Sequence, residues 1–252
     1  MLKKRVMPWV VPVCLLFAWQ LASSAGILPP NVLPSPVAVV KAAWGLTQSG
    51  QLFNYIGAST KRALIGFLVG GGIGFGLGLF TGLSKKAESL LDSTVQMIRN
   101  VPHLALIPIV ILWFGIGEEA KLFLVALGTF FPIYLNTFHG IRSVDRALIE
   151  MGEVYGLKGT ALFWHMILPG ALPSILVGVR YALGVTWVTL IVAETIASNS
   201  GIGYMAMNAR EFMQLDVVVL SIVLYALLGK LSDWLAKIAE QRLLKWHPSY
   251  QK

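Results

Sequence analysis

The residues best suited to specific chemistry lie in a polar segment, residues 144–169, between long apolar runs. If residues 145–155 form a helix, Arg146, Glu150 and Glu153 share one face. The other face then carries apolar side chains, namely Leu148, Met151, Val154 and Tyr155. A helix with one charged and one apolar face is suited to binding another molecule, so the sequence predicts a docking segment. An amphipathic loop lying on lipid headgroups is the alternative.

The rest of this segment predicts how its helix ends. Gly156 can take a positive φ and close the helix, and Gly159 offers a second break before a further helix over residues 161–168. Leu168 precedes Pro169 and is therefore biased away from the helical region, which should stop that second piece. We expect a helix, a tight corner and a second short helix.

Enzyme chemistry lacks a comparable set of residues. None of the four histidines stands at metal-ligand spacing from another or from a carboxylate, and the sequence has no Gly-x-Ser-x-Gly motif. It also lacks the phosphate-binding pattern Gly-x-x-x-x-Gly-Lys-Ser/Thr. The sequence thus predicts no catalytic residue, no metal site and no ATP hydrolysis by this chain.

The composition is that of an integral membrane protein. Hydrophobic residues make up 56% of the 252 positions, charged residues 13%, and the mean hydropathy is +0.71. The net charge of +8 would suggest nucleic acid in a soluble protein, but the basic residues lie mostly at the ends of apolar runs. We therefore expect lipid as a partner and no nucleic acid. A single cysteine, Cys14, excludes an intrachain disulfide.

Six apolar runs approach the ~20 residues that a helix needs to cross a bilayer. The predicted spans are residues 6–25, 63–83, 101–117, 122–139, 172–193 and 216–231. With a cytoplasmic N-terminus, fifteen Lys and Arg residues fall inside and five outside, which is the positive-inside bias. Both termini and residues 144–169 are then cytoplasmic.

The first run has a second interpretation. Its basic start, apolar stretch and Ser23-Ser24-Ala25 also fit a cleavable signal peptide. We interpret the run as the first span. After it, prolines should keep residues 29–36 extended, and residues 37–58 are expected to form a short interfacial helix and its loop on the outer surface.

Glycines dominate the second predicted span. Five stand at strict four-residue spacing, which places them on one helix face: Gly66, Gly70, Gly74, Gly78 and Gly82. Without side chains on that face another helix can approach closely, a main source of helix association in lipid. We predict a helix-packing seam.

The spacing within residues 144–169 resembles the signature of permease subunits of bacterial ABC importers, which reads Glu-Ala-Ala, three residues, Gly, nine residues, Ile, one residue, Leu-Pro. Glu150, Gly156, Leu168 and Pro169 match, while Met151, Gly152 and Met166 replace the usual Ala, Ala and Ile. Residues 97–108, 113–117 and 194–204 are similar to the subfamily that imports sulfonates, taurine and nitrate, most of all to its aliphatic sulfonate members.

The resemblance implies an all-α type I ABC importer permease of the bacterial inner membrane, with residues 1–252 as one domain of six transmembrane helices. A cytoplasmic coupling helix would lie between spans 4 and 5, and its Glu150 and Glu153 could make charge-assisted contacts with an ATPase. The implied ATPase-coupling residues are Glu150, Gly152, Glu153, Gly156, Leu157, Leu168 and Pro169.

The resemblance also implies the partners: a second copy of this chain, two ATP-binding subunits that bind ATP and Mg²⁺, and a periplasmic substrate-binding protein. This chain itself would bind no cofactor. Taurine, nitrate and other small compounds compete with aliphatic sulfonates as the substrate. A self-sufficient secondary transporter or channel is the alternative from a different class.

For the translocation path, an anionic sulfonate would favour polar or basic neighbours in the membrane, and the candidates are Asn136, Arg180, Thr186 and Thr189. Glu194 would repel a sulfonate. Both charged residues have a structural alternative, with Arg180 snorkelling to the inner headgroups and Glu194 holding the outer end of its helix.

Overall fold

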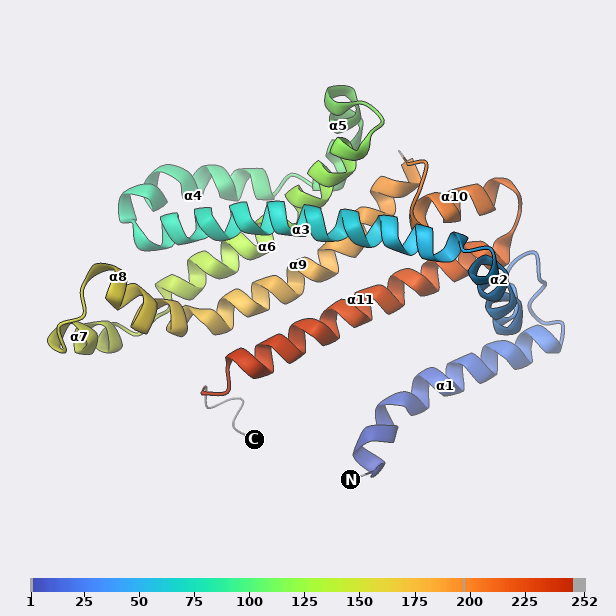
Figure 1. Ribbon diagram of the computed structural model, residues 1–252, viewed down its shortest axis with the longest axis horizontal. Helices are drawn as coiled ribbons and strands as arrows, with labels where there is room; N and C mark the ends of the chain where they lie inside the picture. Colours follow the sequence, from blue (N-terminus) through green and yellow to red (C-terminus); the bar gives the residue numbers. More distant parts are fainter. Residues whose placement is uncertain (1, 197, 247–252) are drawn as a thin grey trace. The chain divides into compact units, whose positions relative to one another are not determined.

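The computed structural model describes residues 2–196 and 198–246, and this part of the chain is helical without a strand (Figure 1). The α-helices are α1 (Leu2–Ser24), α2 (Pro36–Gln48), α3 (Gln51–Leu83), α4 (Lys85–Arg99), α5 (Ile107–Phe114), α6 (Glu118–Arg142), α7 (Arg146–Val154), α8 (Gly159–Leu162), α9 (Leu168–Ile196), α10 (Ile202–Glu211) and α11 (Leu215–Leu243). A 3₁₀-helix, η1 (His103–Leu106), precedes α5, and a π-helix, η2 (Phe163–Ile167), precedes α9.

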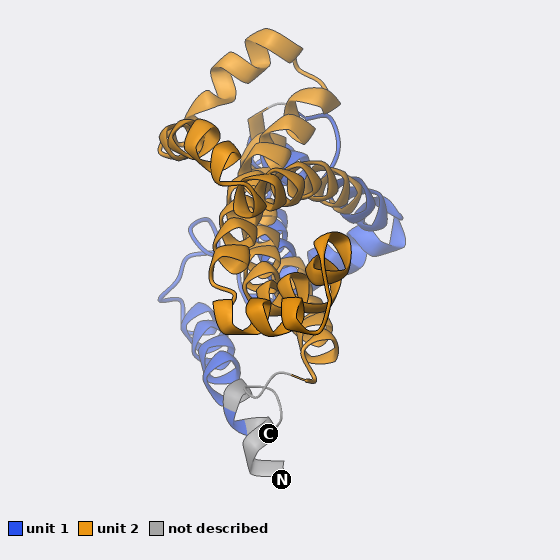
Figure 2. Cartoon of the chain, turned by 90° about the vertical axis from the view of Figure 1, so that its left-hand side faces the viewer, with its two compact units in different colours: residues 1–59, 198–226 blue, residues 60–197, 227–252 orange. Residues whose placement is uncertain are grey.

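The chain divides into two compact units (Figure 2). The first unit comprises residues 1–59 and 198–226, and the second comprises residues 60–197 and 227–252. Helices α3 and α11 each pass from one unit into the other. Every residue proposed above for coupling, translocation or helix packing lies in the second unit.

In the first unit, side-chain caps define where helices begin. The Ser35 hydroxyl accepts a hydrogen bond from the Ala38 N–H at 3.2 Å, and Pro36 occupies the first turn of α2, where its missing N–H is not needed. The hydroxyl of Ser59 in α3 accepts from the Ile202 N–H at 2.8 Å, at the start of α10. These bonds supply partners for amides that have none within their own helix.

The expected loop before the second span is shorter than predicted. Helix α2 ends at Gln48, Gly50 takes a φ of 74°, and α3 starts at Gln51. Residues 51–58 are therefore helical rather than loop, and α3 runs for 33 residues. The sequence lacked a breaker between Gln51 and the apolar run, so the helix begins before its apolar part.

Four helices are long and apolar enough to cross a membrane: Gln51–Leu83, Glu118–Arg142, Gly159–Ile196 and Leu215–Leu243. The predicted spans at 63–83, 122–139, 172–193 and 216–231 each fall within one of them. The helix pair Lys85–Arg99 and His103–Phe114, bent by 79°, would make a fifth, and the apolar helix Val10–Ser24 is shorter. Length and composition in the described residues thus give four spans, or five with the bent pair, against six predicted.

The predicted third span, residues 101–117, is not a single helix. It consists of η1 and the eight-residue α5, and α5 extends only ~12 Å at ~1.5 Å per residue. Pro102 disfavours helical geometry at the preceding residue, which separates this segment from α4. Pro108 sits in the first turn of α5, where it is tolerated, and Gly115 ends the helix with a φ of 74°.

Helix α6 packs against α3 along the five glycines named above. A Cβ added at Gly74 would lie 2.5 Å from the Phe130 carbonyl oxygen, and one at Gly78 would lie 2.8 Å from that of Tyr134. Comparable contacts face the other members of the row, Gly66, Gly70 and Gly82. The backbones of α3 and α6 therefore approach more closely than any side chain would allow.

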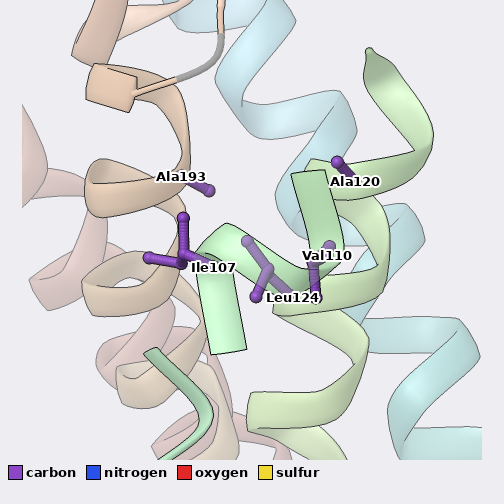
Figure 3. Close-up of a cluster of buried hydrophobic side chains, with 5 residues drawn as sticks. All are labelled: Ile107, Val110, Ala120, Leu124 and Ala193. Atoms are coloured by element: carbon purple, nitrogen blue, oxygen red, sulfur yellow. The ribbon is translucent and has the colours of Figure 1, made fainter. Parts of the chain in front are cut away.

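On another face α6 packs against α9, and α5 closes one end of this pair. The Ser174 hydroxyl of α9 donates to the Asn136 carbonyl of α6 at 2.8 Å. Figure 3 shows the apolar cluster that joins α5, α6 and α9, which consists of Ile107, Val110, Ala120, Leu124 and Ala193. These contacts hold α6 and α9 together. They therefore also fix the position of α7, α8 and η2, which lie between α6 and α9 in the chain.

Candidate functional site

The first part of the polar segment forms the helix α7, which lies where α6 ends and α9 begins (Figure 1). A carboxylate oxygen of Asp145 accepts from the Ala147 N–H at 2.9 Å and caps its start. At its end Gly156 takes a φ of 84°, its N–H donates to the Glu153 carbonyl at 2.9 Å, and the Leu157 N–H donates to the Gly152 carbonyl at 3.0 Å. This pair of bonds is a Schellman motif, which requires a positive φ at one residue.

One face of α7 is packed against the chain. A Cβ at Gly152 would lie 2.9 Å from a Leu162 methyl carbon and 3.1 Å from the Met166 Cγ, so α7 rests directly on α8 and η2. Ile149 packs on the buried cluster of Ile141, Val144, Ala171 and Ile175. The absence of a side chain at Gly152 thus sets how close α7 comes to the start of the next long helix.

The remaining surface of α7 is open. Glu150 and Glu153 are exposed, and so are the four apolar residues of the opposite face. Val154 is 86% and Tyr155 79% exposed. A nine-residue helix that leaves large apolar and acidic side chains uncovered has the character of a surface for another protein.

The expectation that Leu168 and Pro169 stop a helix is wrong. Helix α8 continues through η2 into α9, giving a helical run of 38 residues, Gly159–Ile196. At the junction the Leu168 N–H donates to the Phe163 carbonyl five residues earlier. The wider π-turn relieves the clash that Pro169 would make with the carbonyl four residues before it in a regular α-helix.

Arg180 and Thr189, two of the four predicted path residues, line one cavity of about 690 Å³. The Nε of Arg180 donates to a carboxylate oxygen of Asp233 in α11 at 2.5 Å. The Thr189 hydroxyl and the Nε2 of His103 are 3.0 Å apart and form a hydrogen bond. The rest of the lining is Val177, Tyr181, Gly184, Val185 and Val188.

The other two predicted path residues lie elsewhere. Thr186 is buried, donates to the Ala182 carbonyl at 2.9 Å and lines a separate cavity of about 220 Å³. Asn136 donates to the Pro132 carbonyl at 2.8 Å and lies at the contact of α6 with Gly178 of α9. Both side chains bond to carbonyls of their own helix.

Sequence reasoning missed a buried ion network among α3, α6 and α9. Arg62 donates to both carboxylate oxygens of Glu118 and to Glu194, each at 2.7 Å. Lys121 donates to Glu118 at 2.8 Å. The side chains of Arg62 and Glu194 are only 6% and 0% exposed. Each residue stands at the end of an apolar run, which was the available signal, but the pairing needs the tertiary fold.

No three His, Cys, Asp or Glu side chains within residues 2–196 and 198–246 are grouped as a metal site would require. Of the four histidines, His247 lies outside the described residues. His165 bonds the Ala161 carbonyl at 2.8 Å within its own helix. The described residues thus offer an exposed helix face and a cavity.

Comparison with known proteins identifies the family. Residues 72–245 match the family described as binding-protein-dependent transport system inner membrane component. The chain is 63% identical, over 98% of its length and 94% of the relative's, to the putative aliphatic sulfonates transport permease protein SsuC of Escherichia coli strain K12. The protein of the same name from Bacillus subtilis strain 168 is 45% identical over 96% of this chain and 88% of the relative.

A solved structure shares the fold. The crystal structure of an amino acid ABC transporter contains a chain that matches with a TM-score of 0.64 at 15% identity, over 79% of this chain and 97% of that one. This likeness confirms the expected all-helical importer permease fold. The relatives of this chain are permease proteins of transport systems, so the role of the chain is transport rather than catalysis. The chain belongs to the inner membrane components of binding-protein-dependent transport systems, as a multi-pass permease.

Proposed function

We propose that this chain is the membrane subunit of an ATP-driven importer for aliphatic sulfonates. The observation that carries the substrate assignment is the identity, along almost the whole chain, to a relative named for aliphatic sulfonates. The complete importer would contain two copies of the chain, two ATP-binding subunits that hold ATP and Mg²⁺, and a periplasmic protein that delivers the substrate.

Helix α7 is the proposed contact with an ATP-binding subunit. Its exposed apolar residues, Val154 and Tyr155 above all, would enter a groove of that subunit, while Glu150 and Glu153 would bond basic groups at the rim. The Schellman motif at Gly156 and the contact of Gly152 with Met166 support this role, because a surface that transmits force must be fixed to what it moves.

The movement would pass along one continuous helix. The run Gly159–Ile196 spans ~57 Å at ~1.5 Å per residue, and it carries Glu194 near its far end. There the bonds of Arg62 to Glu194 and Glu118 join α9 to α3 and α6. ATP binding would draw the two copies of α7 together and turn the cavity between the membrane subunits outward, and hydrolysis would reset it.

The proposed orientation has both termini and α7 in the cytoplasm. The excess of basic residues on that side supports it. The contacts of Arg62 with Glu118 and Glu194 are also in keeping with it, since they join the start of α6 and the end of α9 to the part of α3 just before its apolar run, and this orientation assigns all three to the outer side. Within the path we propose Arg180 and Thr189, which share a cavity, rather than Asn136 and Thr186.

Reconstitution in proteoliposomes tests the proposed function. The chain assembled with its ATP-binding subunit and binding protein should accumulate alkanesulfonate only when ATP is present, and omission of either partner should abolish uptake. ATP-independent accumulation by the chain alone would instead identify a secondary transporter or channel. Parallel assays with taurine and nitrate test the substrate: preference for either of these over alkanesulfonates would overturn the sulfonate assignment while leaving the importer mechanism intact.

A further inference from the structure

The cavity that Arg180 and Thr189 share carries a polar pair toward each end, with Val177 beyond Arg180, and a largely apolar wall between the pairs. Its α9 residues recur at spacings of three and four, so they form one stripe along that helix. Arg180 and Asp233 lie at one end, and Thr189 with His103 lies at the other. Nine residues separate Arg180 from Thr189 in sequence, which is ~13 Å along a helix. Between them the wall is formed by Tyr181, Gly184, Val185 and Val188.

A broken helix contributes to this cavity. His103 follows the 79° break between α4 and the η1–α5 segment. Irregular backbone at membrane depth is tolerated where it is buried in protein or lines a cavity, and broken helices build substrate sites in other transporters. A Cβ at Gly128 of α6 would lie 2.9 Å from the Thr189 hydroxyl and 3.2 Å from the His103 Nε2. The glycine therefore leaves room for the His103–Thr189 pair.

At the charged end of the cavity, acidic residues of α11 hold the Arg180 side chain in place. Asp233 binds the Nε of Arg180 and lies 3.5 Å from the Lys230 amine, and a Glu240 oxygen is 3.9 Å from an Nη of Arg180. The Arg180 side chain is nevertheless 44% exposed, so its guanidinium is fixed in direction yet open to the cavity. Ionisable groups in spans that face a cavity commonly mark a substrate path.

Building on the proposed function, we propose that this cavity holds the alkanesulfonate in transit and selects it by chain length. The sulfonate group carries three acceptor oxygens and no donor, which suits the guanidinium of Arg180 and the hydroxyl of Tyr181. The alkyl chain then lies along Gly184 and Val188 toward Thr189. An anion with an apolar tail matches this order of groups, whereas a small inorganic anion would leave the apolar wall unused.

Gly184 provides a sharp test, because a Cβ added there meets no atom within 4 Å. Gly184→Leu should therefore place a branched side chain in the middle of the cavity, with its Cβ in open space. With the complete importer in proteoliposomes, we expect uptake of octanesulfonate to fall about tenfold relative to methanesulfonate, in the range by which pockets discriminate methylene groups. ATPase stimulation by the loaded binding protein should persist. Gly72→Leu is the matched control, since Gly72 of α3 is equally open and does not line this cavity.

The outcomes separate the two proposals. If the wild-type importer takes up no alkanesulfonate, the proposed function fails. If the wild type transports and Gly184→Leu lowers uptake of every chain length equally, or of none, the cavity proposal is overturned. Val188→Ala, which removes bulk from an exposed lining residue, should shift preference the other way, toward longer chains. An unchanged preference in that variant also contradicts the proposal, and it does not depend on Gly184→Leu folding.

Discussion

Arg62 and Glu194 form an ion pair between helices α3 and α9, and both side chains are buried. A pair of this kind adds little net stability against a well-packed apolar substitute, but loss of one partner leaves the other charge buried without compensation. Glu118, which is 55% exposed, bonds the same guanidinium from the surface side. The pair therefore ties the end of α9 to α3.

At this scale we expect Glu194→Gln to destabilise the protein by ~3 kcal/mol, because the charge of Arg62 stays buried with one carboxylate instead of two. Thermal unfolding of the purified protein in detergent measures the effect. Lys61→Gln, which changes an exposed neighbour of Arg62, should leave the melting temperature unchanged. Equal stability of Glu194→Gln and Lys61→Gln would show that the pair has no structural weight.

Among the elements, the contact between α3 and α6 shows how the spacing of glycines in the sequence produces close helix packing. The four-residue spacing was enough to predict that one face of α3 is used for close contact. It could not name α6 as the neighbour, because all five other predicted spans were possible partners. The exposed faces of α3 also carry glycines, Gly72 and Gly76, that meet nothing within 4 Å.

This contrast makes a paired prediction. Gly74→Ala places a Cβ against the Phe130 carbonyl and should cost ~1–3 kcal/mol as overpacking. Gly76→Ala, two residues away and open, should be neutral or slightly stabilising through helix propensity. Unfolding of both variants under identical detergent conditions gives the comparison. A similar loss in the two variants would indicate a general effect of replacing glycine rather than a seam.

Helix α7 was the element that the sequence predicted best, since its start at Asp145 and its end at Gly156 are local signals. The continuation through Pro169 was missed because it depends on a π-turn, which has no simple sequence signature. The third predicted span, residues 101–117, is helical only over His103–Phe114, because Pro102 separates it from α4 and Gly115 ends it, and hydropathy does not register either break.

For the proposed coupling surface, we expect Glu150→Gln with Glu153→Gln to weaken association with the ATP-binding subunit a few-fold, since exposed ion pairs contribute ~0.2–1 kcal/mol each. Co-purification of the two subunits across a salt series measures this loss, which should shrink as salt rises. Glu211→Gln on α10 removes an exposed acid elsewhere and serves as the control. Identical salt profiles for the double variant and the wild type would exclude a role for these carboxylates.

For the whole molecule, composition and the charge at the ends of apolar runs predicted a multi-pass membrane protein, the resemblance of residues 150–169 to the importer signature predicted a permease, and the family comparison confirms that class. The buried ion network and the shared cavity of His103, Arg180 and Thr189 could not be predicted, because they join residues from helices far apart in sequence. Such contacts are set by how helices pack, and hydropathy carries no information about that.

The proposed orientation is testable because Cys14 is the chain's only cysteine. In a Cys14→Ser background, a cysteine replacing Val154, which is 86% exposed, should react with an impermeant maleimide only from the cytoplasmic side. A cysteine replacing Phe212, which is 68% exposed, should react only from the periplasmic side. Labelling of intact cells and of inverted vesicles distinguishes the two. Reversed labelling would invert the orientation, and labelling of both positions from one side would contradict the predicted span count.

The long helix from Gly159 to Ile196 is fastened near both ends, by Met166 against Gly152 and by Glu194 against Arg62. An α-helix turns by ~100° per residue, so one residue inserted between these anchors would rotate one of them to the wrong side of the helix. The number of residues from Met166 to Glu194 is therefore as constrained as their identities. A substitution within this stretch changes one side chain and leaves both contacts facing their partners. A single-residue insertion or deletion would rotate Met166 and Glu194 relative to each other, so that only one of the two contacts could form.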